Sequence, residues 1–317
     1  MYRLHLHRRL LLLWAALLAA AAIASPSLAN EAPLPHVAVI YPQVREPYRA
    51  VFRSISEGIA AASARSAVHE LAPGEDLPAV ERKLAAQPLD AVILLGKRGL
   101  DLSAQLGSST RRIVGAVFAQ PDEIAPGVSV ISLAPAPRML FARLRELAPA
   151  VRRIHVIHGV DANDWLIERA KQDAAAAGYE LVSQRMDSIR DGANAYRELL
   201  PMMRSPQDAL WLLQASPFLD EASVLQMVLR AAWDRNLVIF SSNPSHVPKG
   251  ALFALFPNDN ELGRRLAREA ATAPTPDARL QPLEQLHTAI NIRTADHLGL
   301  GLDARDPRFN MVFPSRL

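Results

Sequence analysis

Two pairs of side chains have types and spacings that could support catalysis or metal binding. His155 and His158 lie three residues apart, and so do Asp161 and Asp164. Imidazoles can ligate a metal, and paired carboxylates can act as acid and base. However, the histidines lie in an apolar run typical of a strand, where residues three apart point to opposite faces. The aspartates flank Asn163 just before a helical pattern, where Asp and Asn commonly cap a helix. We therefore expect structural roles for both pairs.

The motifs of nucleophilic and cofactor chemistry are missing from the sequence. The chain has no cysteine, which excludes disulfides, thiolate metal sites and cysteine nucleophiles. It has no Gly-x-Ser-x-Gly elbow and no phosphate loop ending in Gly-Lys-Ser/Thr, and Gly299 and Gly301 lack the rest of a dinucleotide fingerprint. The sequence predicts a protein that is not an enzyme and holds no metal or other cofactor.

The elements that must position the remaining polar residues alternate between strand and helix patterns. Short apolar runs typical of buried strands lie at 36–41, 67–71, 90–95, 112–118 and 128–133, and again at 154–158, 179–183, 209–213, 237–240 and 251–256. Helical periodicity lies at 51–62, 77–86 and 96–106, and again at 165–177, 193–203, 219–235 and 260–271. Strands that alternate with helices of ~10–15 residues are typical of parallel sheets covered on both faces. Two such sets predict an α/β fold with two Rossmann-like lobes.

Candidate binding residues follow from this arrangement, because ligands of open parallel sheets lie beyond the carboxyl ends of the strands. In the first half of the chain, the polar and aromatic residues at these ends are Tyr41, Gln43, Lys97, Arg98, Phe118 and Gln120. In the second half they are His158, Asp161, Asn163, Gln214, Ser216, Ser242 and Asn243. Structural alternatives stay open for some of them. Tyr41 could pack at a sheet edge, and Ser242 and Asn243 could form the turn before Pro244.

The first thirty residues have the layout of a secretory signal peptide. Three arginines precede the apolar run Leu10–Ala24, and Ser27 and Ala29 supply small side chains for a cleavage site before Asn30. The run is shorter than the ~20 residues that cross a bilayer core, which favours cleavage over membrane anchoring. We expect residues 1–29 to be removed and the mature protein to be periplasmic.

The basic charge of the chain belongs to this segment. The full sequence has 35 Lys and Arg against 32 Asp and Glu, and the signal segment holds three arginines and no acidic residue. The mature part is therefore balanced, and its composition gives no reason to expect binding to nucleic acid.

Several segments in order resemble the ABC-transporter substrate-binding proteins related to bacterial tryptophan- and tyrosine-binding lipoproteins. The segment 208–269 is similar to that family in its strand at 208–212, its strand at 237–240, Lys249-Gly250-Ala251 and Leu262-Gly263-Arg264. Residues 290–299 resemble the family's closing motif, and residues 147–154 resemble its passage into the second lobe. Such an ordered set is more specific than a lone motif.

The resemblance implies a type I periplasmic binding fold, with two lobes joined by three crossovers near residues 134, 256 and 284. Lobe one would comprise residues 31–133 and 258–275, and lobe two residues 134–256 and 286–317. It also implies a monomer that closes on a small-molecule ligand by a hinge movement and delivers it to an ABC permease.

The sequence departs from the family at positions that bear on the ligand. The acidic residue usual after the fourth strand is replaced at Phe118–Pro121, and the family's acidic motif of the second lobe is replaced at Gln214–Ser216. Lys97 and Arg98 stand where the family has small and hydroxyl residues. We expect a ligand with an anionic group and no obligatory amine. Two alternatives stay open: a ligand-presenting partner of a membrane sensor, and a periplasmic enzyme.

Overall fold

A computed structural model describes residues 34–107, 110–159, 163–214, 216–220, 222–272 and 280–314. The expected signal segment, residues 1–29, and the candidate Asp161 lie outside the described residues. Among the residues described, no helix is long and apolar enough to cross a membrane.

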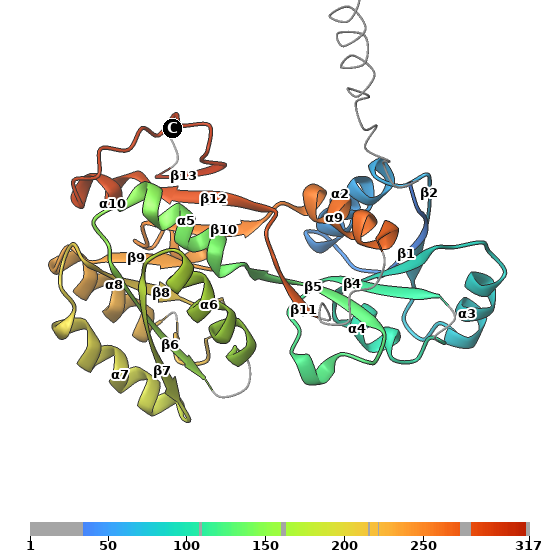
Figure 1. The fold of residues 1–317 in the computed structure, drawn as a ribbon, viewed down its shortest axis with the longest axis horizontal. Helices are drawn as coiled ribbons and strands as arrows, with labels where there is room; N and C mark the ends of the chain where they lie inside the picture. Colours follow the sequence, from blue (N-terminus) through green and yellow to red (C-terminus); the bar gives the residue numbers. More distant parts are fainter. Residues whose placement is uncertain are drawn as a thin grey trace, which may run out of the picture. The chain divides into compact units, whose positions relative to one another are not determined.

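The first sheet has six parallel strands in the order β11-β5-β4-β3-β1-β2 (Figure 1). These strands are β1 (His36–Pro42), β2 (Arg65–Leu71), β3 (Ala91–Leu95), β4 (Arg111–Val117), β5 (Val128–Pro135) and β11 (Leu280–Leu283). Every residue of β3 is buried, as expected for a strand covered by helices on both faces.

The helices of this lobe come from two distant parts of the chain. They are α2 (Tyr48–Ala61), α3 (Leu77–Ala85), α4 (Gly96–Ser103) and α9 (Asp259–Ala271), with a short 3₁₀ turn η1 (Pro121–Glu123). The helix α9 returns from the second half of the chain and packs closely against α2 (Figure 1). Leu262 and Leu266 of α9 lie in one core cluster with Ile55 and Ile59 of α2.

The second sheet has seven strands in the order β13-β12-β10-β9-β8-β6-β7. They are β6 (Arg153–Gly159), β7 (Glu180–Met186), β8 (Asp208–Leu212), β9 (Val238–Ser241), β10 (Phe253–Pro257), β12 (Leu286–Asn291) and β13 (Met311–Phe313). The strand β12 runs antiparallel to β10, and the other pairs are parallel.

Separate hydrophobic clusters fill the two faces of the second sheet. The helices of this lobe are α5 (Pro137–Leu147), α6 (Asp164–Ala176), α7 (Ile189–Met202), α8 (Val224–Asp234) and α10 (Ile292–His297), with a 3₁₀ turn η2 (Pro244–His246). One cluster contains residues of α5 and α6 together with the fully buried Trp211, whose ring contacts Phe141 edge-on and stacks near Phe240. The other contains residues of α7 and α8.

The chain passes between the two sheets three times: from β5 to α5, from β10 to α9 and from β11 to β12. The backbone N–H of Ala136 donates to the carbonyl of Leu283 at 2.7 Å, and that of Asn258 donates to Gln285 at 3.0 Å. The three crossovers are therefore hydrogen-bonded side by side. This confirms the predicted α/β fold of two lobes joined by a three-crossover hinge.

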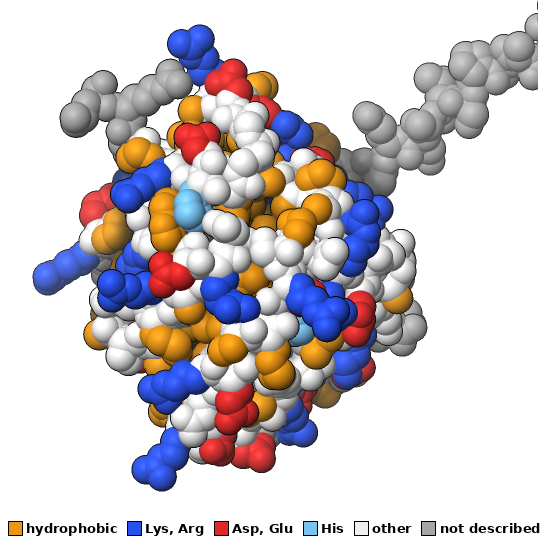
Figure 2. Space-filling model, turned by 90° about the vertical axis from the view of Figure 1, so that its left-hand side faces the viewer, with side chains coloured by type: hydrophobic (Ala, Val, Ile, Leu, Met, Phe, Trp, Pro, Cys, Tyr) orange, Lys and Arg blue, Asp and Glu red, His pale blue; other side chains and the backbone are white. Residues whose placement is uncertain are grey.

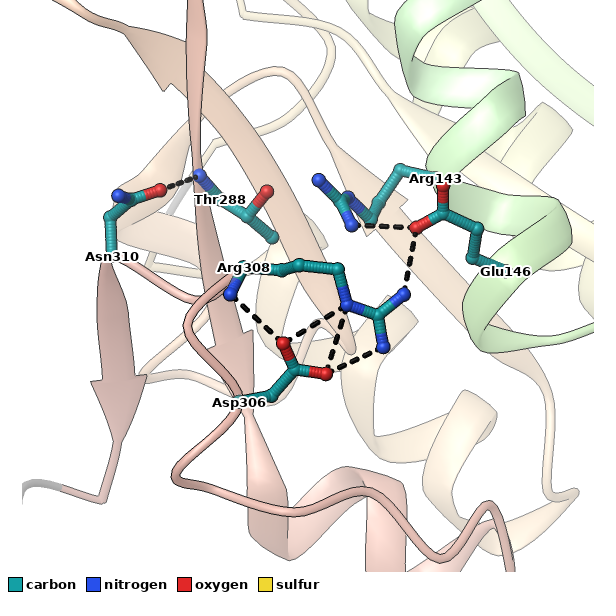
Figure 3. A network of polar contacts seen from close by, with 6 residues as sticks. All are labelled: Arg143, Glu146, Thr288, Asp306, Arg308 and Asn310. Atoms are coloured by element: carbon teal, nitrogen blue, oxygen red, sulfur yellow. Dashed lines mark hydrogen bonds and ion pairs between the residues drawn. The ribbon is translucent and has the colours of Figure 1, made fainter.

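The C-terminal segment is fixed to the second lobe by a polar network (Figure 3). The guanidinium of Arg308 contacts both carboxylate oxygens of Asp306 and lies 3.2 Å from Glu146 of α5, which also pairs with Arg143 at 2.6 Å. The hydrogen bonds from Arg308 lower the pKa of Asp306 to about 2. Asn310 exchanges hydrogen bonds with the backbone of Thr288 in β12. The network attaches this segment to both α5 and β12.

Candidate functional site

The predicted binding residues come from three neighbouring strands in each sheet. The strands β4, β3 and β1 are adjacent in the first sheet, and β9, β8 and β6 are adjacent in the second. Because neighbouring parallel strands end at the same edge, the fold brings each set of strand ends together. In each lobe, these strand ends lie along one edge of the sheet.

Tyr41 does not point its hydroxyl out of the first lobe. Its side chain is only 7% exposed, its ring stacks on Phe52 at 5.3 Å, and its hydroxyl donates to Glu70 at 3.1 Å. Burial, together with the nearby Glu70 carboxylate, raises the pKa of Tyr41. Tyr41 thus packs against Phe52 of α2 and Glu70 of β2, on a strand that lies between β3 and β2 in the sheet. Gln43, two residues further, is exposed, and its backbone N–H donates to Leu71.

Lys97 and Arg98 are adjacent residues of α4 with different partners. The ammonium of Lys97 donates to Glu123 at 2.9 Å and lies 3.2 Å from Asp101. The hydrogen bond to Glu123 raises the pKa of Lys97, and the same contact lowers the pKa of Glu123. Arg98 is partly buried and donates one N–H to the carbonyl of Ala72 at 3.2 Å. A guanidinium has five N–H donors, so Arg98 keeps more capacity for a ligand than Lys97 does.

The end of β4 supplies an apolar and a polar group. The ring of Phe118 is 44% exposed, which is unusual for a large aromatic side chain. Gln120 is half-buried, and its backbone N–H donates to the carboxylate of Glu123 at 2.8 Å. Glu123 thus fixes the β4 end and neutralises Lys97 at the same time.

In the second lobe, His158 is buried at the end of β6. Its Nδ1 lies 3.3 Å from the carbonyl of Gly159 and 3.3 Å from Asp164, the first residue of α6. Asp164 also pairs with Arg185 of β7 at 3.4 Å. Asn163 stands at the N-cap position of α6 and is buried. The strand end is therefore held by polar contacts between β6, α6 and β7.

The ends of β8 and β9 are tied together by side chains. The hydroxyl of Ser242 accepts a hydrogen bond from Nε1 of the buried Trp211 at 2.9 Å. Asn243 accepts from the backbone of Ser245 at 3.0 Å and so begins η2, which agrees with the turn alternative. Gln214 and Ser216 are half-buried after β8. The Ser216 hydroxyl lies near Tyr196, whose pKa burial raises strongly.

A serine and a histidine lie in contact beside this edge. The hydroxyl of Ser241 is 2.8 Å from Nδ1 of His246, but it also accepts from the N–H of Asn243 and lies 3.2 Å from the carbonyl of Leu212. Ser241 is fully buried, and a nucleophile needs access to its substrate. The pair therefore has the surroundings of a structural contact. Within the described parts of the chain, no group of three His, Cys, Asp or Glu residues is placed to hold a metal ion.

Sequence reasoning missed three residues at these edges. Tyr48 begins α2 just after β1 and is 69% exposed, and Glu123 and Arg185 supply the ion pairs described above. Tyr48 could have been found, because it follows a strand and opens an amphipathic helix. Glu123 and Arg185 act through contacts distant in sequence, which no local pattern indicates.

Comparisons with known proteins agree with this fold. A ligand-free, open structure of a substrate-binding protein with adhesive properties from Clostridium difficile is similar over 89% of this chain and 100% of that chain, with a TM-score of 0.60 and 15% identity. The likeness is one of fold: two α/β lobes joined by three crossovers. A structure of the ABC domain from Streptococcus pneumonia in complex with L-Trp covers 87% of this chain and 99% of its own, at 16% identity and a TM-score of 0.49. No family model matches the chain, and no curated protein matches it in sequence.

Proposed function

We propose that the protein is an exported solute-binding protein that captures a small organic ligand between its two lobes and delivers it to an ABC transporter. The observation that carries this proposal is the position of the strand ends. Three neighbouring strands in each lobe end in polar side chains, on a fold similar to that of an open, ligand-free substrate-binding protein. Ligand sites of open α/β sheets lie at such ends.

The ligand that this site favours has an anionic group. Of the two cations after β3, Lys97 is already neutralised by Glu123 and Asp101. Arg98 is therefore the cation that would bind the anionic group. A planar guanidinium can bind a carboxylate or phosphate through two parallel hydrogen bonds. The described strand ends offer amides and hydroxyls, and an exposed Phe118 ring could cover an apolar part of the ligand.

Two further features belong to the same proposal. The layout of residues 1–29 supports export and a periplasmic location for the mature protein. We propose that the mature protein acts as a monomer without catalysis, because capture requires only the two lobes. The buried Ser241–His246 contact offers no accessible nucleophile.

A thermal-shift screen of the mature protein tests the proposal. The panel would contain carboxylates, phosphorylated solutes, amino acids and sugars, since a ligand that binds only the folded state raises its melting temperature. We expect at least one anionic solute to raise it by several degrees and to protect residues of both lobes from hydrogen exchange. Protection confined to one lobe would contradict capture between lobes.

Delivery to a transporter needs a separate test. Deleting the gene should abolish uptake of the ligand found in the screen, and restoring wild-type protein to the periplasm should recover it. Unchanged uptake in the deletion strain would contradict the transport role and leave only ligand presentation to another partner.

A further inference from the structure

A groove of about 860 Å³ lies along one face of α8 in the second lobe. Leu225, Leu229 and Ala232 of α8 line it from the buried core, and Leu298 and Phe313 are the half-buried apolar residues of its lining. Other lining residues come from the 248–250 loop, the start of α10 and the end of β13. Its lining includes Leu237 just before β9 and Gly250 just before β10, so the groove lies toward the amino ends of these strands. The proposed solute site lies at their carboxyl ends, and the groove is therefore a separate feature.

The rim of the groove carries an excess of positive charge. Arg230, Lys249 and Arg293 line it together with His297, and among the described lining residues Asp234 is the one acid. Neither Arg230 nor Arg293 has a hydrogen bond or an ion pair with any residue in the described ranges. Lys97 at the proposed solute site, by contrast, is paired twice. These two arginines thus keep their N–H donors available for an anion.

An aromatic stack fixes the wall between α8 and α10. The rings of Trp233 and His297 are 3.6 Å apart and nearly parallel, and Nε2 of His297 donates to the carbonyl of Trp233 at 2.9 Å. The guanidinium of Arg293 lies 5.5 Å from the centre of the Trp233 ring. This arrangement holds Arg293 by a cation–π contact, which orients the side chain without using an acidic partner.

The 248–250 loop of the groove is held by hydrogen bonds from the start of α10. The side-chain amide of Asn291 donates to the carbonyl of Val247 at 2.7 Å, and the hydroxyl of Thr294 donates to Gly250 at 3.1 Å. Figure 2 faces the α8 and α10 side of this lobe and shows many Lys and Arg side chains among hydrophobic ones. The groove therefore combines half-buried apolar groups, a cationic rim and a wall held by hydrogen bonds.

We infer that this groove is a second binding site, and that its ligand is an amphipathic anion: an apolar or aromatic body carrying a carboxylate, sulfonate or phosphate group. The volume falls within the range of small-molecule sites, about 300–1,000 Å³. The apolar body would lie against Leu298 and Phe313, and the charged group would meet Arg230 and Arg293. This assignment does not depend on the proposed solute function, because all the lining residues belong to one lobe.

Dye binding tests the site. The probe is anilinonaphthalene sulfonate, a fluorescent aromatic anion, and its neutral counterpart phenylnaphthylamine reports the apolar contribution alone. Arg230→Gln is the decisive variant because Arg230 contacts no described polar partner, so its loss should leave the fold intact. Arg293→Gln is the second variant, and Arg268→Gln, an exposed arginine of α9 in the other lobe, is the matched control.

We expect each groove variant to weaken binding of the anionic dye about tenfold or more, since charge-assisted hydrogen bonds are the strong ones. Binding of the neutral dye should change less than about twofold in every variant, and Arg268→Gln should bind both dyes like the wild type. Unchanged binding of the anionic dye to Arg230→Gln would overturn the inference. An equal loss for both dyes would also overturn it, because the arginines would then act through the fold and not through charge.

A second experiment distinguishes two sources of such an anion. Soluble aromatic and medium-chain carboxylates and phosphate monoesters would compete with the dye if the natural ligand is a free solute. Co-sedimentation with phosphatidylglycerol vesicles, but not with phosphatidylcholine vesicles, would identify a lipid headgroup, provided that Arg230→Gln abolishes it. If no soluble anion competes with the dye and the protein does not co-sediment with phosphatidylglycerol vesicles, the assignment of this ligand class is overturned.

Discussion

Lys97 and Arg98 show how neighbouring residues can differ in what they offer a ligand. Both follow β3, the most deeply buried strand of the first lobe, and both open α4. Lys97 turns to Glu123 and Asp101, while Arg98 reaches Ala72 at the end of β2. The sequence predicted the two cations but not their partners, because Glu123 lies 26 residues from Lys97 along the chain.

Replacing Arg98 by alanine should weaken binding of the solute that gives the largest thermal shift. A charge-assisted hydrogen bond contributes about 1.5–3 kcal/mol, so the dissociation constant should rise by about tenfold or more. Lys97→Ala is the matched control and should cost less than about 1 kcal/mol, because its ammonium is exposed and already paired. Isothermal titration of the three proteins measures both effects. Equal losses in the two variants would refute the different roles assigned to them.

His155 should make the stability of the fold depend on pH. The ring is buried between β-strands, and its Nε2 lies 3.6 Å from Asp208. Burial lowers the pKa of His155, and the attraction of Asp208 opposes this shift only in part. In the unfolded chain, the imidazole titrates near its ordinary value of about 6.5. Below that pH, the unfolded state binds a proton that the folded state does not, so stability falls as the pH decreases.

Urea unfolding between about pH 7.5 and pH 5.5 measures this effect. The free energy of unfolding should decrease toward the acidic end for the wild type. The decrease should be smaller for His155→Gln, which cannot titrate. An identical pH profile for His155→Gln and the wild type would show that His155 is not the group responsible.

Two glycines allow the helices α2 and α9 to pack closely. A Cβ atom at Gly263 would lie 2.0 Å from the carbonyl oxygen of Ile55, and one at Gly58 would lie 1.9 Å from that of Asn260. Both clashes involve backbone atoms, which cannot rotate away as a side chain can. The close approach of α2 and α9 therefore depends on glycine at both positions.

Gly263→Ala should destabilise the protein, although alanine has a higher helix propensity than glycine. Alanine in a helix interior gains about 1 kcal/mol over glycine, but overpacking costs about 1–3 kcal/mol and more when backbones must separate. We expect a net loss of about 2 kcal/mol in the free energy of unfolding. Arg268→Ala, exposed on the same helix, should change it by less than about 0.5 kcal/mol. A Gly263→Ala protein as stable as the wild type would contradict this account of the packing.

The sequence predicted the central elements of both lobes but missed several at the crossovers. The strands β3 and β8 and the helix α6 lie within a residue or two of their predicted positions. The helix α5 was missed, although Leu140, Phe141 and Leu144 have helical spacing. β11 has only four residues and pairs with β5, about 150 residues away, so no local pattern could identify it.

For the whole molecule, the prediction of two lobes succeeded because it rests on repeated alternation and not on any one element. The site is less predictable from sequence for a physical reason. Strand ends follow from hydrophobic patterns, but the direction of each side chain depends on partners from other loops. Tyr41 lies at the end of β1 and Ser242 follows β9, as predicted, yet their hydroxyls are bonded to Glu70 and Trp211.

Export of the protein should remove its first 29 residues. Protein recovered from the periplasm should begin at Asn30, because Ser27 and Ala29 meet the requirement for small residues before the cleavage site. Replacing Ala29 by Tyr should block cleavage and leave the precursor in the membrane fraction. N-terminal sequencing of both fractions measures this. Wild-type protein that retains Met1 in the inner membrane would contradict a cleaved signal.

The three crossovers should allow the two lobes to close on a ligand. The crossovers are short, and they are hydrogen-bonded to one another through Ala136, Leu283, Asn258 and Gln285. Small backbone rotations in them can turn one lobe against the other while the core of each lobe stays packed. A ligand held by strand ends of both lobes binds the closed state more tightly and shifts the population toward it.

Small-angle scattering should therefore give a smaller radius of gyration at saturating ligand than without ligand. A solute that produced no thermal shift is the matched control and should leave the radius unchanged. Arg98→Ala should need a higher ligand concentration to reach the same final radius, because the substitution weakens binding without altering the crossovers. If the radius stays constant while titration shows full occupancy, the ligand binds without lobe rotation, and the hinge mechanism fails even though the binding function stands.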